Sequence, residues 1–198
     1  MGDPGSDDDL VRRYLAGDAN AFATLMRRHE TRIYTLCLRT LGNADDAADA
    51  AQDAFLTALR KLEGFRGEAA FGTWLHRVAV NACYDLLRKR RRQPMLRLAE
   101  DEEHPRAELE PAEPDIAEEV VGTQDAAAAL RLIPEEFRIA LILADVQDLA
   151  YDQIARILEV PVGTVKSRVH RGRVALARIL DPSDGEPDPV SRTSQEEA

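Results

Sequence analysis

Apolar residues recur every three or four positions along most of the chain, which is the spacing of an amphipathic helix. Between residues 10 and 92 the pattern contains no proline and breaks only at glycines. A first helical run ends at Gly42, and Asn43 is a suitable N-cap for a second run to about Leu62. A third run extends from about residue 70 to 91. The pattern therefore predicts a bundle of long helices in the first half of the chain.

The helical pattern stops near Pro94, which we expect to end the third helix, and it resumes near residue 124. Residues 93–123 are rich in acids, proline and alanine and lack a sustained amphipathic period, which indicates a flexible acidic linker. No strand pattern or internal repeat stands out in the sequence, so the predicted fold class is all-α. The later helices are predicted over residues 124–132, 134–146, 151–158 and 161–180.

This organisation predicts two small, separately folded helical domains. The N-terminal bundle covers residues 10–92, and a C-terminal helical domain covers residues 124–180. The two ends of the chain, residues 1–9 and 181–198, are predicted to be disordered tails.

The net charge of −10 is distributed unevenly, and this changes which partners are plausible. Residues 10–92 carry 15 Lys and Arg against 9 Asp and Glu, and residues 124–180 carry 8 against 7. The excess of acids therefore lies in the linker and the tails. An acidic protein as a whole repels polyanions at long range. The two helical regions nevertheless offer local basic faces to nucleic acid.

The helices predicted at residues 151–158 and 161–180 have the helix-turn-helix pattern. A tight turn separates them, and Pro161 occupies a first-turn position at which its missing N–H costs nothing. Acids are absent from residues 164–180. An ordinary helical hairpin with a solvated basic face is the alternative to a DNA-binding motif. In a DNA-binding motif, the residues available to bases and phosphates are Thr164, Lys166, Ser167, Arg168, His170, Arg171 and Arg173.

Three aromatic residues lie around the start of the third predicted helix. Phe65, Phe71 and Trp74 occupy a short glycine-containing segment, and the helix that follows ends in a basic run at residues 88–92. Aromatic side chains beside cations suit single-stranded nucleic acid, because an unpaired base can stack on them or insert between them. Core packing is the rival explanation for each of these aromatics taken alone.

A row of acids marks the second predicted helix. The helix dipole explains Asp45 and Asp46 near the N-terminus, whereas Asp49 and Asp53 lie too far along the helix for that explanation. Like charges four residues apart destabilise a helix slightly, so the row favours a cationic partner surface. A merely solvated acidic face is the alternative.

In three motifs the chain resembles the extracytoplasmic-function (ECF) subfamily of bacterial RNA polymerase sigma factors, within the sigma-70 family. The motifs are the acidic helix over residues 45–55, the segment 65–75 with the helix after it, and residues 161–168. The resemblance covers residues 10–92 and 124–180. It implies a promoter-specificity subunit with no catalytic site, cofactor or metal. The first domain would be sigma region 2, which binds core RNA polymerase and melts the minus-ten element. The second would be region 4, which reads the minus-thirty-five element.

The resemblance also assigns roles to individual residues. Those that would contact the clamp helices of the largest polymerase subunit are Asp45, Asp46, Asp49, Gln52, Asp53 and Phe55. Those that would hold the melted minus-ten strand are Phe65, Arg66, Phe71, Trp74, Arg77, Asn81, Asp85, Arg88 and Lys89. The outward residues of the helix-turn-helix would contact the minus-thirty-five duplex, and region 4 would touch the polymerase flap. The family further implies an anti-sigma factor as a partner, and a linker that threads polymerase channels otherwise used by RNA.

One departure from the family's pattern concerns the first helix of the helix-turn-helix. Ala150 and Gln153 stand where the family usually has Ser or Thr and an acid, so the capping box is predicted to be missing. Two rivals from other classes remain open. A stand-alone helix-turn-helix regulator would bind duplex DNA without polymerase, and the acidic helix discriminates against it. A helical enzyme is the remoter rival, because the sequence offers no nucleophile context or metal-binding motif.

Cysteine content and hydropathy bear on the compartment. Cys37 and Cys83 lie in apolar helical patterns with no paired Cys or His at metal spacing, which predicts buried thiols in a reducing environment. No stretch approaches the ~18 apolar residues of a membrane span, and no signal peptide is visible. We therefore expect a cytoplasmic protein with no membrane insertion of its own.

Overall fold

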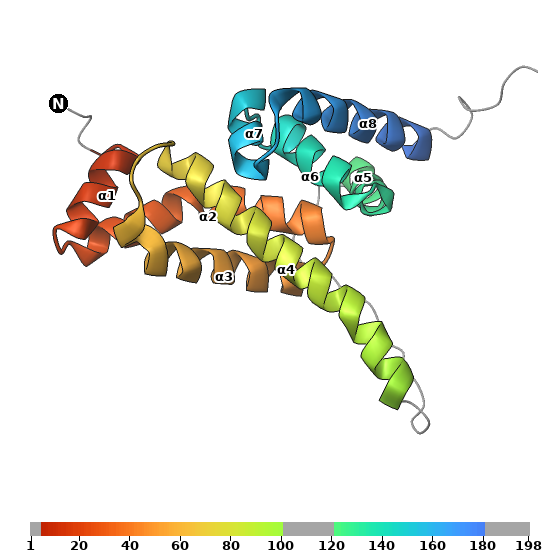
Figure 1. Cartoon of the computed structure of the whole chain (residues 1–198), viewed down its shortest axis with the longest axis horizontal. Helices are drawn as coiled ribbons and strands as arrows, with labels where there is room; N and C mark the ends of the chain where they lie inside the picture. The colour runs from red at the N-terminus through yellow and green to blue at the C-terminus, as the bar shows by residue number, and fades with distance from the viewer. Residues whose placement is uncertain (1–4, 101–120, 181–198) are drawn as a thin grey trace, which may run out of the picture.

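The computed structural model describes the backbone of residues 5–100 and 121–180, and the side chains within 5–92 and 127–180. Over these residues the chain forms helices and no strand, which confirms the predicted all-α class (Figure 1). The first set comprises α1 (Asp7–Leu15), α2 (Ala19–Leu41), α3 (Ala44–Lys61), the 3₁₀ turn η1 (Leu62–Gly64) and α4 (Phe71–Glu100). The second set comprises α5 (Val121–Leu132), α6 (Glu135–Leu141), the π-helical turn η2 (Ile142–Val146), α7 (Tyr151–Leu158) and α8 (Val162–Leu180).

The helix α1 begins inside the segment that was predicted to be a disordered tail, so that prediction is wrong from Ser6 onward. The Ser6 hydroxyl accepts a hydrogen bond from the Asp9 N–H at 3.2 Å and caps the helix. The Asp7 carboxylate pairs with Arg28 at 2.6 Å and with His29 at 2.7 Å on α2. Capping and these contacts to α2 together fix the segment.

The helix ends around α2 and α3 follow the sequence prediction. Gly42 closes α2 with a φ of 70°, a left-handed conformation that strains any residue with a Cβ. Asn43 then caps α3, because its side-chain oxygen accepts the Asp46 N–H at 3.0 Å. The prediction that Pro94 ends the third helix is wrong, since α4 runs through it to Glu100. A proline inside a helix removes one backbone hydrogen bond, and α4 is already anchored upstream by its buried residues.

The two helical sets pack against each other, as the arrangement of α7 on α4 shows (Figure 1). One apolar cluster contains Cys37 of α2, Cys83 of α4, and Ile139, Ile142 and Ile154 of the C-terminal set. Both predicted helical regions are present, and in this structure they share this apolar core. The physical reason is that residues 138–143 of α6 and η2 are buried on every side, so the core of the C-terminal region alone cannot cover them.

Both cysteines lie in the core. Cys37 of α2 and Cys83 of α4 are free and buried, which confirms the prediction of buried thiols.

Of the helices in 5–100 and 121–180, none has both the length and the apolar character needed to cross a membrane.

Candidate nucleic-acid and polymerase interfaces

The helix-turn-helix forms at the predicted place. Helix α7 ends at Leu158, its C-cap Glu159 adopts a left-handed conformation with a φ of 54°, and α8 begins at Val162. The inner faces of the two helices bury Ile154, Ile157, Val165 and Val169. This leaves the opposite face of α8 to solvent.

A close contact between α6 and α8 was not predicted from the sequence. A Cβ on Gly172 would lie 3.0 Å from the main-chain oxygen of Phe137, so only glycine lets the two helices approach this closely. A glycine in the middle of a predicted helix was the available signal.

The predicted duplex-binding residues of α8 differ in how exposed they are and in whether they already have a partner in the protein. Lys166, Ser167 and His170 are exposed, while Thr164 and Arg168 are partly buried. Arg171 and Arg173 are also exposed but already have partners in the protein.

The partners of these two arginines lie on neighbouring elements. The Arg171 guanidinium lies 5.6 Å from the centre of the Phe137 ring, within cation–π range. Arg173 donates two hydrogen bonds to Asp145, at 2.6 and 3.0 Å, and this carboxylate raises the pKa of Arg173 further above its usual value. A phosphate would have to compete with Asp145 for Arg173.

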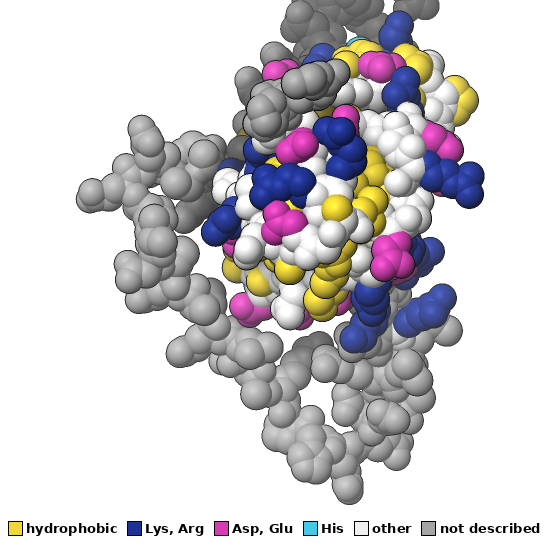
Figure 2. Space-filling view, turned by 90° about the vertical axis from the view of Figure 1, so that its left-hand side faces the viewer, with side chains coloured by type: hydrophobic (Ala, Val, Ile, Leu, Met, Phe, Trp, Pro, Cys, Tyr) yellow, Lys and Arg dark blue, Asp and Glu magenta, His cyan; other side chains and the backbone are white. Residues whose placement is uncertain are grey.

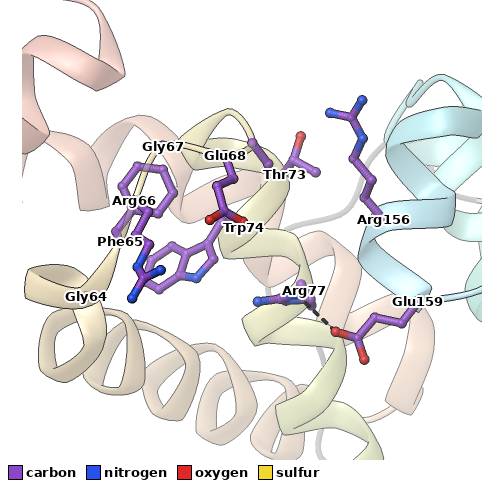
Figure 3. A pocket seen from close by; sticks show the side chains of 11 residues that line it. Gly64, Phe65, Arg66, Gly67, Glu68, Thr73, Trp74, Arg77, Arg156 and Glu159 are labelled. Carbon is purple, nitrogen blue, oxygen red and sulfur yellow. Dashed lines mark hydrogen bonds and ion pairs between the residues drawn. The ribbon is translucent and has the colours of Figure 1, made fainter.

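A pocket of about 420 Å³ opens beside the loop before α4. Figure 3 shows Phe65 and Trp74 on one wall, with the side chains of Arg66 and Arg77 nearby. The Phe65 and Trp74 ring centres are 5.2 Å apart. Four of the residues predicted for the melted strand are thus brought together around one cavity. Arg156 and Glu159 of α7 complete the lining and were not predicted.

Phe71 differs from the other two aromatics. Its side chain is only 2% exposed, and its ring packs edge-on against Phe65 at 6.0 Å and lies 5.7 Å from Trp74. The rival core explanation therefore holds for Phe71, which supports the pocket wall from behind and does not line the cavity. Its role as a strand contact stays a prediction, and in this arrangement it would require the side chain to be uncovered.

A second cavity, of about 620 Å³, lies between α3 and α4 and is lined by polar and apolar side chains in about equal measure; we call it the α3–α4 cleft. The predicted strand-binding residues Asn81, Asp85 and Lys89 line it from α4. Arg88 is exposed and forms an ion pair with Asp85. The opposite wall belongs to α3. It carries Asp53, which was predicted as a polymerase contact, and Thr57, Arg60 and Lys61, which were not predicted. In the sequence, Arg60 and Lys61 look like the basic residues that are common at a helix C-terminus. Only the packing of α3 on α4 places them opposite Lys89.

The acidic helix α3 presents most of its predicted polymerase contacts to solvent. Asp45, Asp49, Gln52 and Asp53 are exposed, whereas the Asp46 carboxylate pairs with Arg90 of α4. Phe55 is 8% exposed and belongs to the core, so it offers an edge and not a free side chain.

An apolar groove of about 670 Å³ runs between α2 and α3 beside these acids. Its lining includes Phe22, Met26, Phe55, Leu56 and Leu59, and the two leucines are exposed by 45% and 36%. This groove was not predicted from the sequence, although Leu56, which lies off the predicted apolar face of this helix, was a signal for it. Figure 2, which views the α1 end of the molecule, shows hydrophobic side chains exposed in a strip among Lys, Arg, Asp and Glu.

An aromatic pocket at the start of α4, the α3–α4 cleft with its three cations, an acidic helix and a helix-turn-helix together define the class of sigma-70-type transcription factors. Family models agree with this class, because Sigma-70 region 2 matches residues 25–93 and Sigma-70, region 4 matches residues 123–176.

Similar proteins narrow the class. The ECF RNA polymerase sigma factor SigM of Mycobacterium tuberculosis is 40% identical over 178 residues, covering 88% of this chain and 85% of that protein. The ECF RNA polymerase sigma-E factor of Escherichia coli K12 is 35% identical over 190 residues, covering 92% and 98%. The chain belongs to the ECF family of RNA polymerase sigma factors, which direct promoter-specific transcription initiation.

Solved structures have the same fold. The sigma factor RpoE, in complex with the anti-sigma factor NepR from Bartonella quintana, superposes with a TM-score of 0.64 at 25% identity, covering 80% of this chain and 96% of that one. CnrH, in complex with the cytosolic domain of CnrY, gives a TM-score of 0.66 at 24% identity, covering 90% and 99%.

Proposed function

We propose that three surfaces of this chain divide the work of promoter recognition. The exposed acids of α3 and the adjoining apolar groove bind core RNA polymerase. The aromatic pocket and the α3–α4 cleft hold the melted minus-ten strand, and the outer face of α8 reads the minus-thirty-five duplex. The domains that carry these surfaces are residues 10–92 and 124–180, joined by the linker at residues 93–123.

The polymerase surface is supported by charge and by apolar area on the same element. Asp49 and Asp53 are exposed on α3, where they gain nothing from the helix dipole. Leu56 and Leu59 expose apolar surface one to two turns further along. Apolar anchors rimmed by charge are typical of a protein interface. Clamp helices with basic side chains at the rim would complement this surface.

The strand surface rests on the single most informative observation, which is that α4 connects the pocket to the cleft. Trp74 and Arg77 lie at the pocket, and Asn81, Asp85 and Lys89 lie along the cleft. A base removed from the duplex could enter the pocket and stack on Trp74 or Phe65, while cations in the cleft would neutralise the phosphates that follow.

Three expectations from the family belong to the same proposal. An anti-sigma factor binds the chain and holds it inactive, as the complexes of similar sigma factors with anti-sigma factors suggest. The protein has no catalytic activity of its own and works where the polymerase is, in the cytoplasm. Residues 101–120 of the predicted acidic linker lie outside the described residues, and the contact of region 4 with the polymerase flap stays a prediction.

Run-off transcription tests the proposal. The full-length protein is added to core polymerase with sheared DNA from the source genome, and the 5′ ends of the transcripts are sequenced. We expect start sites that share two spaced upstream elements and that disappear without the protein. A set of starts identical to that of core enzyme alone would overturn the proposal.

A pull-down separates the proposal from the stand-alone regulator. Asp49→Lys with Asp53→Lys should reduce capture of core polymerase and leave duplex binding by the helix-turn-helix unchanged. The control is Glu63→Lys, an exposed acid just beyond α3 that lines neither the cleft nor the groove. Equal capture of the wild-type chain and the double variant would contradict the assignment of α3.

A further inference from the structure

One carboxylate of α1 holds the ring of a buried histidine on α2. The Asp7 carboxylate, in the first turn of α1, pairs with Arg28 at 2.6 Å and lies 2.7 Å from Nε2 of His29. Because a carboxylate only accepts hydrogen bonds, Nε2 is the protonated nitrogen of the ring and donates a hydrogen bond to Asp7. The Arg28 side chain is 43% exposed, and exposed ion pairs stabilise weakly, so the contact that reaches the core is the one to His29.

The bond to Asp7 is the only hydrogen bond of the His29 ring within the described residues. His29 is 7% exposed, and its second ring nitrogen, Nδ1, is buried without a partner there. A buried N–H without an acceptor is unfavourable, so a ring that lost Asp7 would turn toward water. Asp7 therefore decides which way the His29 ring faces.

The His29 ring packs against the start of α4. Its centre lies 5.4 Å from the centre of the Phe71 ring, in an edge-on arrangement. A Cβ on Gly72 would lie 3.3 Å from Cε1 of His29, so the ring also lies close to the main chain in the first turn of α4. Phe71 in turn packs against Phe65 and Trp74, with ring centres 6.0 and 5.7 Å away. The His29 ring therefore supports the wall of the aromatic pocket from behind.

The body of α1 is held on α2 by apolar contacts that do not involve Asp7. Leu10 and Val11 of α1 are buried in the core, and the Tyr14 ring lies 5.4 Å from the ring of Phe22 on α2. Loss of the Asp7 carboxylate should therefore loosen the first turn of α1 and release the His29 ring, while the body of α1 stays in place.

We propose that Asp7 and His29 are positioning residues for the capture of an unpaired base. The N-terminal helix α1 acts through them to hold Phe71 and, with it, the pocket wall formed by Phe65 and Trp74. Stacking is most favourable on a ring that is already held in place, because a mobile ring must first be ordered. The effect on DNA rests on the proposed function of the pocket, whereas the effect on the wall does not.

Tryptophan fluorescence tests the effect on the wall without DNA. Trp74 is the single tryptophan of the chain, so the emission of the full-length protein reports on the pocket wall. Asp7→Ala should shift this emission to longer wavelength and increase its quenching by acrylamide, because a released wall admits water. The matched control is Asp8→Ala, which removes an exposed carboxylate from the same turn of α1 and should change neither signal. Signals of Asp7→Ala that match those of the wild type would overturn the role of Asp7.

A double variant shows whether Asp7 acts through His29. His29→Leu fills most of the volume of the ring but has no N–H to donate. In that background, adding Asp7→Ala should cause no further change in emission or quenching, because the two residues act as one unit. Additive changes would show that Asp7 acts by another route and would overturn the role of His29. Asp7 is only partly buried, so the comparison of Asp7→Ala with Asp8→Ala does not depend on the His29 variant.

Transcription tests the effect on DNA. With core polymerase and the strongest promoter from the run-off experiment, Asp7→Ala should lower transcription from the duplex by about fivefold, the factor that corresponds to one lost hydrogen bond. A template already melted at the minus-ten element should restore most of it, and capture of core polymerase should equal that of the wild type. Equal losses on the duplex and the melted template would overturn the positioning role. If the wild type directs no promoter-specific starts, the proposed function fails, and fluorescence alone decides whether Asp7 holds the wall.

Discussion

At the scale of single residues, Trp74 and Phe71 show how burial separates two neighbouring aromatics. Trp74 is partly exposed on the pocket wall, while Phe71 is almost completely buried behind it. We predict that Trp74→Ala lowers run-off transcription from duplex promoters by about tenfold or more, because stacking on a base is worth about 1–3 kcal/mol. Transcription from a template already melted at the minus-ten element should recover in large part.

Phe71→Ala provides the contrast for that prediction. Removing a buried phenylalanine costs about 3–5 kcal/mol of folding free energy, so the free energy of unfolding should fall strongly and a melted template should not restore activity. Equal loss of stability in the two variants, measured by urea unfolding, would contradict the division between a contact and a supporting residue.

His76 makes a prediction about pH. Burial lowers the pKa of His76 below its usual value of 6.5, the charges of Arg32 and His29 lower it further, and the hydrogen bonds to Gly72 and Gln147 oppose the shift. The folded chain therefore prefers the neutral ring, and below pH 6.5 the unfolded chain binds more protons. The stability that His76 contributes is present above 6.5 and is lost as the pH falls below it.

Urea unfolding at about pH 8 and about pH 5.5 measures this effect. The wild type should lose more stability between the two conditions than His76→Gln does, because the variant lacks the titrating ring while every other group remains. If both proteins lose the same amount, His76 does not take up protons on unfolding.

At the scale of elements, α7 shows a helix start that is only half capped. The sequence analysis predicted that the capping box is missing, and the structure shows that Gln153 does accept the Ala150 N–H at 3.0 Å. Ala150 has no side-chain oxygen to return the bond to the helix. We predict that Ala150→Ser raises the free energy of unfolding by about 0.5–1 kcal/mol, as an N-cap serine does elsewhere. Thermal unfolding of the two proteins checks this, and Ala150→Gly should gain little.

The ion pair between Arg173 and Asp145 leads to a prediction about α8. Each phosphate that a protein neutralises adds about 0.9 to the slope of log K against log salt. Asp145→Ala frees Arg173, so the slope for duplex binding should steepen by about one and affinity should rise at low salt. Adding Arg173→Ala to Asp145→Ala should remove the increase in slope and in affinity. An unchanged slope in Asp145→Ala would mean that Arg173 never reaches a phosphate.

The sequence was enough to predict which segments are helices and where most of them end. It was not enough to predict which faces of neighbouring helices pack together. The Asn43 cap, the glycine end of α2 and the helix-turn-helix each depend on neighbours in sequence, and all three are present. The cleft that sets Arg60 opposite Lys89 depends on the packing of α3 on α4, which no local pattern encodes. The start of α1 depends on contacts of Asp7 with α2, and so it looked like a tail.

At the scale of the whole molecule, the halves were expected to be independent, and one segment explains why they are not. The run over residues 138–143 is apolar apart from Arg138 and is buried on every side. Read alone, such a run predicts a helix but not its partners. A helix that is apolar all round needs cover on two sides, and here α8 supplies one side while α2 supplies the other.

The two halves of the chain share one apolar core, so we expect them to unfold together. Because Ile142 lies fully buried in the cluster common to both halves, the wild type should unfold in a single transition by calorimetry. Ile142→Ala should remove about 2–5 kcal/mol of stability, mostly from the contact between the halves, and should separate the transition into two. The matched control is Ile33→Ala, a fully buried isoleucine of α2, which should lower the single transition without dividing it. Two transitions in the wild type would mean that the halves already fold independently.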